Sequence, residues 1–260
     1  MGILKGPLGF TGRMGKFTAY TRKGSDKIII RQAKGPSKEQ IRTLYQYERT
    51  RENNAEFAAC NMFVAGVRDA AYPVLHLGDP NFTGALVKLA KKMQELDEIG
   101  ERGERGVFLS RLPHMLTGFN FNINHPFDGL MRHPVAVQTS REEAASTVTI
   151  PRREPGVNVC LPWKSPFYRF VLSLGPAADV QFGARGFECR EAGATKFAFS
   201  EWQHKDASLA EESIAMKMDM PVPPGVSLVL GIGIEMGMPD RFGEVEVIKG
   251  EGGAKVLAVF

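Results

Sequence analysis

The pattern of apolar and polar positions divides the chain near residue 130. Between about residue 37 and that point apolar residues recur at helical spacing, whereas from about Val135 short β-prone runs alternate with turns rich in Gly, Pro and Asp. This change of pattern along the chain predicts an α+β fold. We expect the second half to be an antiparallel β-sandwich, jelly-roll-like or Ig-like.

A β-hairpin is predicted near the N-terminus. Two β-prone runs, 16–22 and 27–31, flank the turn-forming segment Lys23-Gly24-Ser25-Asp26. Glycines recur before it at about every third residue, where they permit close approach of another backbone. These are Gly2, Gly6, Gly9, Gly12 and Gly15. Because an isolated hairpin is marginally stable in water, this one must dock on its own domain or on a neighbour.

Helix signals follow the hairpin. Ser37 and Gln40 have the spacing of a capping box, which predicts the start of a helix. The pair Asn53-Asn54 is the place where this helical run could divide in two. A second helix is expected after the Asp-Pro pair at 79–80, with Asp79 as its N-cap.

The strand pattern of the second half predicts sheets with one buried and one solvent-facing side. In 167–174 the even-numbered positions are all apolar and the odd-numbered ones are mixed. The β-prone runs are 147–150, 167–174, 179–182, 196–199, 213–218, 226–235, 244–248 and 255–260. The last run is apolar throughout its final five residues, so we expect it to be a packed strand.

These patterns predict three segments. They are a Gly-rich basic arm with the β-hairpin over 1–34, a helical region over 35–130 and the antiparallel β-sandwich domain over 131–260. A hydrophobic content of 43% in 260 residues is enough for a folded core. No apolar run approaches the ~18 residues that a membrane span needs. The first residues also lack the apolar segment of a secretory signal, so cytoplasmic residence is the default expectation, with export by another route left open.

Charge is unevenly distributed along the sequence. Residues 1–53 contain twelve Lys/Arg and four Asp/Glu, a net charge of +8, whereas the remaining residues contain 21 and 25, a net charge of −4. A basic N-terminus on an acidic body is compatible with binding to nucleic acid or to an anionic surface. It equally favours head-to-tail attraction between copies of the same chain.

Motifs for catalysis or metal binding are missing from the sequence. The histidines His114, His125 and His133 with Asp128 lack the spacing of a metal site. The three cysteines contain no CxxC pair, and we interpret Cys60, Cys160 and Cys189 as buried free thiols. No phosphate-binding loop or nucleophile elbow occurs. We therefore expect no catalytic, cofactor-binding or metal-ligating residues, no cofactor, and a protein that is not an enzyme.

Two further patterns have a structural and a functional interpretation. The glycines of Gly231-Ile232-Gly233 miss the spacing of a dinucleotide fingerprint, so we interpret them as strand glycines that allow a close approach or a bulge. Trp163, Phe167 and Tyr168 could stack on a carbohydrate. Anchoring of these aromatic side chains in the core is the alternative that we favour.

Three segments of the sequence carry a family resemblance. They are Gly9–Lys16 with the following hairpin that ends at Ile30-Arg31, the segment Leu116–Asn122, and Val229–Glu235. In this order they resemble a bacterial family of unknown function with a Gly-rich N-terminal hairpin, a helical segment and a β-rich C-terminal half. The resemblance implies that order of elements. It implies no activity and no catalytic residues.

Together these observations predict a structural protein that self-associates into a homo-oligomer or filament through its N-terminal arm. The expected contact residues are Phe17, Tyr20, Arg22, Lys27 and Arg31, with Ile28 and Ile30 as apolar anchors. The partner would be another copy of the chain, because a hairpin can add to the open sheet edge of a neighbour. The alternative is a binding module, for carbohydrate through the β-sandwich or for nucleic acid through the basic hairpin.

Overall fold

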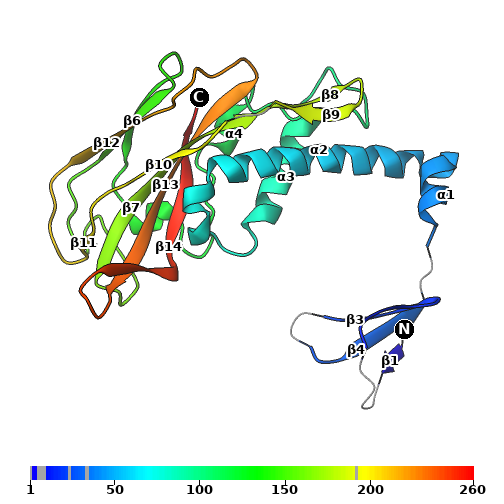
Figure 1. Ribbon diagram of the computed structural model, residues 1–260, viewed down its shortest axis with the longest axis horizontal. Helices are drawn as coiled ribbons and strands as arrows, with labels where there is room; N and C mark the ends of the chain where they lie inside the picture. Colours follow the sequence, from blue (N-terminus) through cyan, green and yellow to red (C-terminus); the bar gives the residue numbers. More distant parts are fainter. Residues whose placement is uncertain (1, 5–9, 23–24, 33–34, 191–192) are drawn as a thin grey trace. The chain divides into compact units, whose positions relative to one another are not determined.

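A computed structural model of the chain describes residues 2–4, 10–22, 25–32, 35–190 and 193–260 (Figure 1). The chain divides into two compact units, Met1–Arg51 and Glu52–Phe260, which we call the N-terminal unit and the main unit. Some sequence predictions lie outside the described residues. These are the turn residues Lys23 and Gly24, the glycines Gly6 and Gly9, and the expected boundary at Lys34.

The N-terminal unit contains a small antiparallel sheet. Its strands are β1 (Gly2–Leu4), β2 (Gly12–Met14), β3 (Phe17–Thr21) and β4 (Ile28–Gln32), in the order β1-β4-β3-β2. Strands β3 and β4 pair antiparallel, which confirms the predicted hairpin. The flanking strands β1 and β2 were not predicted, because three-residue strands that contain glycine carry almost no alternation signal.

Helical structure begins after this sheet with α1 (Lys38–Thr43) and the 3-10 helix η1 (Tyr45–Tyr47). The capping box is confirmed, since the Ser37 side chain accepts from Gln40 N and Ser37 N donates to Gln40 Oε1 at 2.8 Å. The helical run is interrupted at Leu44, whose ψ of 136° is extended. The predicted break at Asn53-Asn54 is wrong. Both side chains are exposed within a continuous helix, where their lower helix propensity costs little.

Five further helical segments run from residue 48 to residue 130. They are α2 (Glu48–Ala70), η2 (Tyr72–Leu77), α3 (Phe82–Glu95), α4 (Pro113–Leu116) and α5 (Phe127–Leu130). Asn81, not the predicted Asp79, occupies the N-cap of α3. The Asp79 carboxylate instead accepts from Asn81 N at 2.6 Å and from Ile123 N at 2.9 Å. Among the described residues, no helix combines the length and the apolar character needed to cross a membrane.

The strands of the main unit pair antiparallel, which confirms the α+β class. A five-stranded sheet has the order β10-β7-β13-β14, with β11 beside β7; β12, β6 and β5 form a three-stranded sheet, and β8 pairs with β9. The strands are β5 (Ala136–Ser140), β6 (Ala145–Ile150), β7 (Phe167–Ala178), β8 (Val180–Gly183), β9 (Gly186–Cys189), β10 (Lys196–Phe199), β11 (Gln203–His204), β12 (Glu212–Lys217), β13 (Val226–Pro239) and β14 (Val245–Val259).

Both faces of the five-stranded sheet are covered over most of its length. On one face, Phe170 and Leu172 of β7 belong to the same apolar cluster as Ile150 of β6 and Met216 of β12. On the other face, Val171 belongs to a cluster formed largely by α2, η2 and α3. Figure 1 shows β6 and β12 on one side of β7, β13 and β14, and α2 and α3 on the other.

The prediction of a solvent-facing side for 167–174 is therefore wrong from Val171 onward. Val171 and Ser173 are fully buried, because the helices of the preceding segment cover them. A Cβ atom at Gly175 would lie 2.5 Å from the Cα of Ala70, which shows how closely α2 approaches the sheet. Helices from 52–130 and strands from 131–260 thus contribute to the same compact unit.

The glycines in β13 allow η2 to approach the sheet. A Cβ atom at Gly233 would lie 2.5 Å from Cδ1 of Leu77, and one at Gly231 would lie 3.3 Å from Cγ2 of Val74. The interpretation of these residues as strand glycines is confirmed. The expected packed strand at 255–260 is also confirmed as part of β14, and Phe260 exchanges two backbone hydrogen bonds with Leu228, at 2.8 and 3.1 Å.

Candidate functional site

The register of the N-terminal sheet gives it two unlike faces. Directly paired residues of antiparallel strands project on the same side, and every second residue along a strand does so too. Phe17 pairs with Met14 and Gln32, and Ala19 pairs with Ile30. We call this side the apolar face; its side chains from β2, β3 and β4 are Met14, Phe17, Ala19, Thr21, Ile28, Ile30 and Gln32.

The opposite side, which we call the basic face, carries a different set of side chains. They are Arg13, Thr18, Tyr20, Ile29 and Arg31, placed there by the pairs Arg13–Thr18, Thr18–Arg31 and Tyr20–Ile29. The Arg31 guanidinium lies over the Tyr20 ring, 5.5 Å from its centroid. This distance is suited to a cation–π contact, which presents a cation above an aromatic ring.

The predicted contact residues are distributed over both faces and the connecting loop. Phe17, Ile28 and Ile30 lie on the apolar face, Tyr20 and Arg31 lie on the basic face, and Arg22 and Lys27 lie exposed between β3 and β4. The strands that carry the first five are central in the sheet, because β1 and β2 occupy its edges. These residues can therefore contact a partner through the faces of the sheet, whereas edge pairing would involve β1 or β2.

The N-terminal unit buries little of its apolar surface. Among the residues of this unit whose exposure the structure describes (10–22, 25–32 and 35–51), only Ala19 is buried, at 2% exposed, whereas Met14 is 62% and Phe17 is 49% exposed. Neither of the two apolar clusters contains a described residue of this unit. The apolar face is thus the clearest candidate for an interaction surface in this part of the chain.

A second candidate site, which the sequence analysis missed, lies on the helix-covered face of the five-stranded sheet. Glu235 of β13 pairs across the strands with Arg169 of β7, whose Nε donates to Glu235 Oε1 at 2.5 Å. The second carboxylate oxygen, Oε2, lies 2.7 Å from Nε2 of His76 in η2. Glu235 itself is only 1% exposed.

The charged state of Glu235 is set by competing effects. Burial by itself raises the pKa of the carboxyl, but the hydrogen bonds from His76 and Arg169, together with their charges, outweigh it. The pKa of Glu235 is therefore lowered from its ordinary value of 4.5. The carboxylate stays ionised at neutral pH and holds one nitrogen of the His76 ring.

An aromatic cavity opens beside this carboxylate. The Arg169 guanidinium lies between two rings, 4.1 Å from the centroid of Phe199 and 4.5 Å from that of Trp202. The cavity has a volume of about 500 Å³ and is lined by Tyr72, Pro73, His76, Arg169, Phe197, Phe199, Glu235, Val247 and Lys249. This volume lies within the range of about 300–1,000 Å³ that is usual for small-molecule sites.

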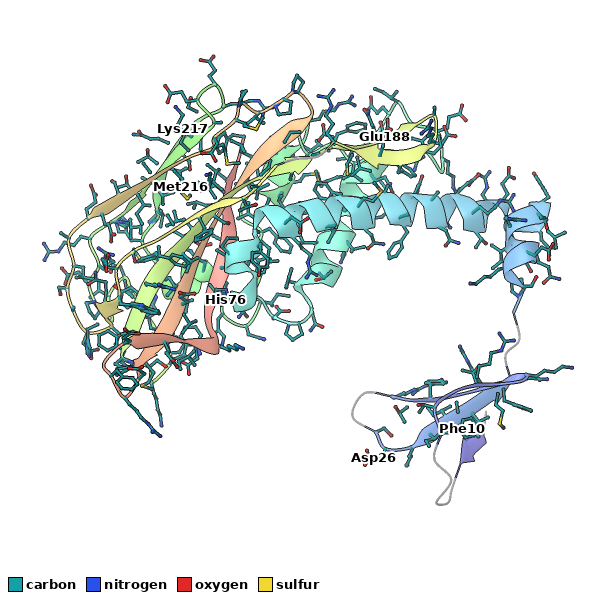
Figure 2. The ribbon with its side chains drawn as sticks, viewed as in Figure 1. Phe10, Asp26, His76, Glu188, Met216 and Lys217 are labelled. Carbon is teal, nitrogen blue, oxygen red and sulfur yellow. The ribbon has the colours of Figure 1, made fainter. Side chains whose placement is uncertain are left out.

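The 3-10 helix η2 forms one wall of the cavity because its side chains repeat every third residue. Val74 and Leu77 are buried against the sheet. Pro73 and His76, one position before each of them, line the cavity instead. Figure 2 labels His76 where η2 lies against the sheet.

The predictions for the cysteines and for the aromatic residues near 163–168 are correct only in part. The three cysteines are free, but burial is correct only for Cys60; Cys160 is half-buried and Cys189 is exposed. Burial raises the pKa of the Cys60 thiol to about 11. Tyr168 lies in the core at 1% exposed, as favoured, and Trp163 packs against the same cluster, with its ring centroid 4.8 Å from that of His125.

In the part of the chain that the structure describes, no group of three or more His, Cys, Asp or Glu side chains is placed to hold a metal ion. Asp128, one of the residues weighed for such a site, forms an ion pair with Lys255. His125 is instead involved in the aromatic contact with Trp163. Comparison of the chain with protein-family models, with curated proteins and with solved structures finds no match.

Proposed function

We propose that this chain is a non-enzymatic structural protein that self-associates into a homo-oligomer or filament through its N-terminal unit. The apolar face of the small sheet packs on a second copy. One observation carries the proposal: the sheet presents Met14, Phe17, Ile28 and Ile30 on one side, and within β2, β3 and β4 only Ala19 is buried.

The part of the N-terminal unit whose exposure the structure describes contributes no residue to either apolar cluster. A sheet of three or more strands with an apolar face can be stable by itself, and packing that face against another element stabilises it further. Complete burial of an exposed large apolar side chain contributes about 1.5–3 kcal/mol. Met14 and Phe17 would supply most of such a gain on docking, and the half-buried Ile28 and Ile30 would add a smaller part. Docking on a partner would stabilise the sheet and hold the two copies together.

Charge favours another copy of the same chain as the partner. Residues 1–51 contain twelve Lys/Arg and three Asp/Glu, a net charge of +9, whereas residues 52–260 contain 21 and 26, a net charge of −5. The basic unit of one copy is therefore attracted to the acidic unit of the next. Such a head-to-tail contact closes into a ring or continues as a filament.

The proposal is tested with two neighbouring isoleucines of β4 whose side chains lie on opposite faces of the sheet. Ile30→Thr places a hydroxyl on the apolar face, and Ile29→Thr places one on the basic face, and both replacements keep a β-branched side chain. Sedimentation velocity over a range of concentrations should show that Ile30→Thr weakens assembly about tenfold or more, while Ile29→Thr changes it little.

Two results would contradict self-association. One is a monodisperse monomer in light scattering and electron microscopy at every concentration and salt condition. The other is an equal effect of the two threonine variants, since the contact would then not depend on the apolar face. Raising the salt concentration should weaken assembly, because exposed charges are screened within about 8–10 Å at physiological salt.

A binding module is the second candidate, and the basic face favours its nucleic-acid form. Arg13, Arg31 and the ring of Tyr20 lie together on that face, a combination suited to phosphates and stacked bases. A titration with single-stranded DNA at low salt distinguishes this candidate, because Ile29→Thr and Tyr20→Ala should then weaken binding more than Ile30→Thr. A glycan array tests the carbohydrate form in the β-rich half.

We also infer that the three-stranded and five-stranded sheets form the two layers of a sandwich, as the sequence suggested for a jelly-roll-like or Ig-like fold. The shared cluster of Ile150, Met216, Phe170 and Leu172 supports this arrangement. The helices on the far face of the five-stranded sheet would then form a third layer, an addition to either of those folds.

A further inference from the structure

The cavity beside Glu235 has exposed aromatic walls. Tyr72 is 75%, Phe197 60% and Phe199 43% exposed, and the ring centroids of Phe197 and Phe199, both on β10, are 5.6 Å apart. Exposed aromatic side chains grouped around a concave surface are typical of binding sites, whereas single exposed apolar residues are ordinary. The walls therefore suit a ring or a short alkyl chain.

Positive charge exceeds negative charge around the cavity. The one carboxylate in its lining, Glu235, is fully engaged by Arg169 and His76. Lys249, at the rim, makes no ion pair with any described residue. The second ring nitrogen of His76, Nδ1, makes no hydrogen bond to a described residue, and the His76 side chain is 38% exposed. An anion would be attracted at this rim and a cation repelled.

We propose that this cavity binds a small amphiphilic anion, a molecule with an aromatic ring or short alkyl chain and a single carboxylate. The apolar part lies against Phe197, Phe199 and Tyr72, and the carboxylate lies near Lys249 and His76. Glu235 does not touch the ligand; it is a positioning residue that holds Arg169 and His76 in place. This site is separate from the self-association surface and does not depend on it.

The probes are three molecules that share a phenylpropyl skeleton and differ in charge. They are 3-phenylpropionate, its neutral amide and 3-phenylpropylamine. Isothermal titration calorimetry with the full chain should give a dissociation constant on the order of 1 mM for the carboxylate, which is ordinary for about eleven non-hydrogen atoms. We expect the amide to bind about fivefold more weakly and the amine to show no binding.

Variants locate the site. Lys249→Gln should reduce the affinity for the carboxylate to that for the amide, while Phe197→Ala should weaken both. Lys217→Gln is the matched control, because Lys217 is an exposed lysine on β12, in the other sheet (Figure 2). It should leave the affinities unchanged, and so should Ile30→Thr, which separates this proposal from the one on assembly.

Three outcomes would overturn the proposal. Equal affinities for the carboxylate and the amide would make the cavity an uncharged apolar docking surface. Unchanged carboxylate binding by Phe197→Ala would place the molecule elsewhere. No heat of binding from any probe at a concentration of several times the expected dissociation constant, with a chain whose circular dichroism shows it to be folded, would mean that the cavity holds no such ligand.

Discussion

The two units of this chain use antiparallel sheets in opposite ways. In the main unit both faces of the five-stranded sheet contribute side chains to apolar clusters, one shared with the helices and one shared with residues of the three-stranded sheet. In the N-terminal unit the sheet has an apolar and a basic face, and a single described side chain, Ala19, is buried. The first sheet has its apolar side chains inside a core, whereas the second leaves Met14 and Phe17 on its apolar face accessible to a partner.

Deleting residues 1–34 is the strongest test of this difference. Assembly should be lost completely, because both faces of the small sheet are removed, while the thermal unfolding of the main unit should change little. Sedimentation velocity measures the first effect and circular dichroism the second. Assembly by the truncated chain would place the contact in the main unit.

Truncating one phenylalanine in each unit tests whether the two units unfold separately. Phe170 is fully buried, so Phe170→Ala should cost about 3–5 kcal/mol of unfolding free energy. Phe17 is about half exposed, and Phe17→Ala should change the unfolding free energy of the main unit by no more than about 0.5 kcal/mol. Tryptophan fluorescence in urea reports the main unit alone, since both tryptophans, Trp163 and Trp202, belong to it. Equal costs would show that the two units unfold as one.

A smaller change in the unfolding free energy is expected for a substitution where α2 approaches the sheet. A Cβ atom at Gly175 would lie 2.6 Å from the backbone oxygen of Ala70, so Gly175→Ala should cost about 1–3 kcal/mol. Gly66 in α2 has open space around it, and Gly66→Ala should instead stabilise the helix by about 0.5–1 kcal/mol. Urea unfolding measures both. Stabilisation by Gly175→Ala would contradict the close packing.

The smallest effect concerns pH. The pKa values of Glu56 and Glu235 are lowered in the fold, despite their burial, by Lys91 and Gly103 at Glu56 and by His76 and Arg169 at Glu235. The ionised forms therefore stabilise the main unit above the ordinary pKa of 4.5, and this stabilisation is lost as the pH falls below it.

Melting temperatures between pH 7 and pH 3 should decrease below about pH 4.5. Glu235→Gln should lower the stability at pH 7 and reduce the decrease at acid pH. If the melting temperature of the variant and that of the native chain decreased equally between pH 4.5 and pH 3, Glu235 would not contribute to this pH dependence.

The sequence predicted correctly those elements that depend on residues close together in the chain. The hairpin of β3 and β4, the capping box at Ser37 and the packed last strand all follow from residues close together in the chain. The covered face at Val171 could not be predicted in this way, because the helices that bury it lie about a hundred residues earlier. The alternation of apolar and polar residues shows that the two sides of a strand differ, but it does not show which element packs against each side.

The same limit explains why the cavity was missed. His76 and Glu235 are 159 residues apart, and Arg169 and Glu235 are 66 apart, so no motif spacing relates them. One signal was present in the sequence: Glu235 and Arg169 each interrupt a run of apolar strand residues. A charge buried in such a strand requires an opposite charge nearby, and that requirement could have suggested the pair.

The unequal cysteines make the native chain a convenient substrate for labelling. A thiol with a pKa of about 11, like that of buried Cys60, remains protonated and unreactive at neutral pH. Cys189 on β9 is exposed, so a maleimide or nitroxide reagent should modify it first. A spin label at that position would report distances between neighbouring copies in an assembly without any change to the sequence.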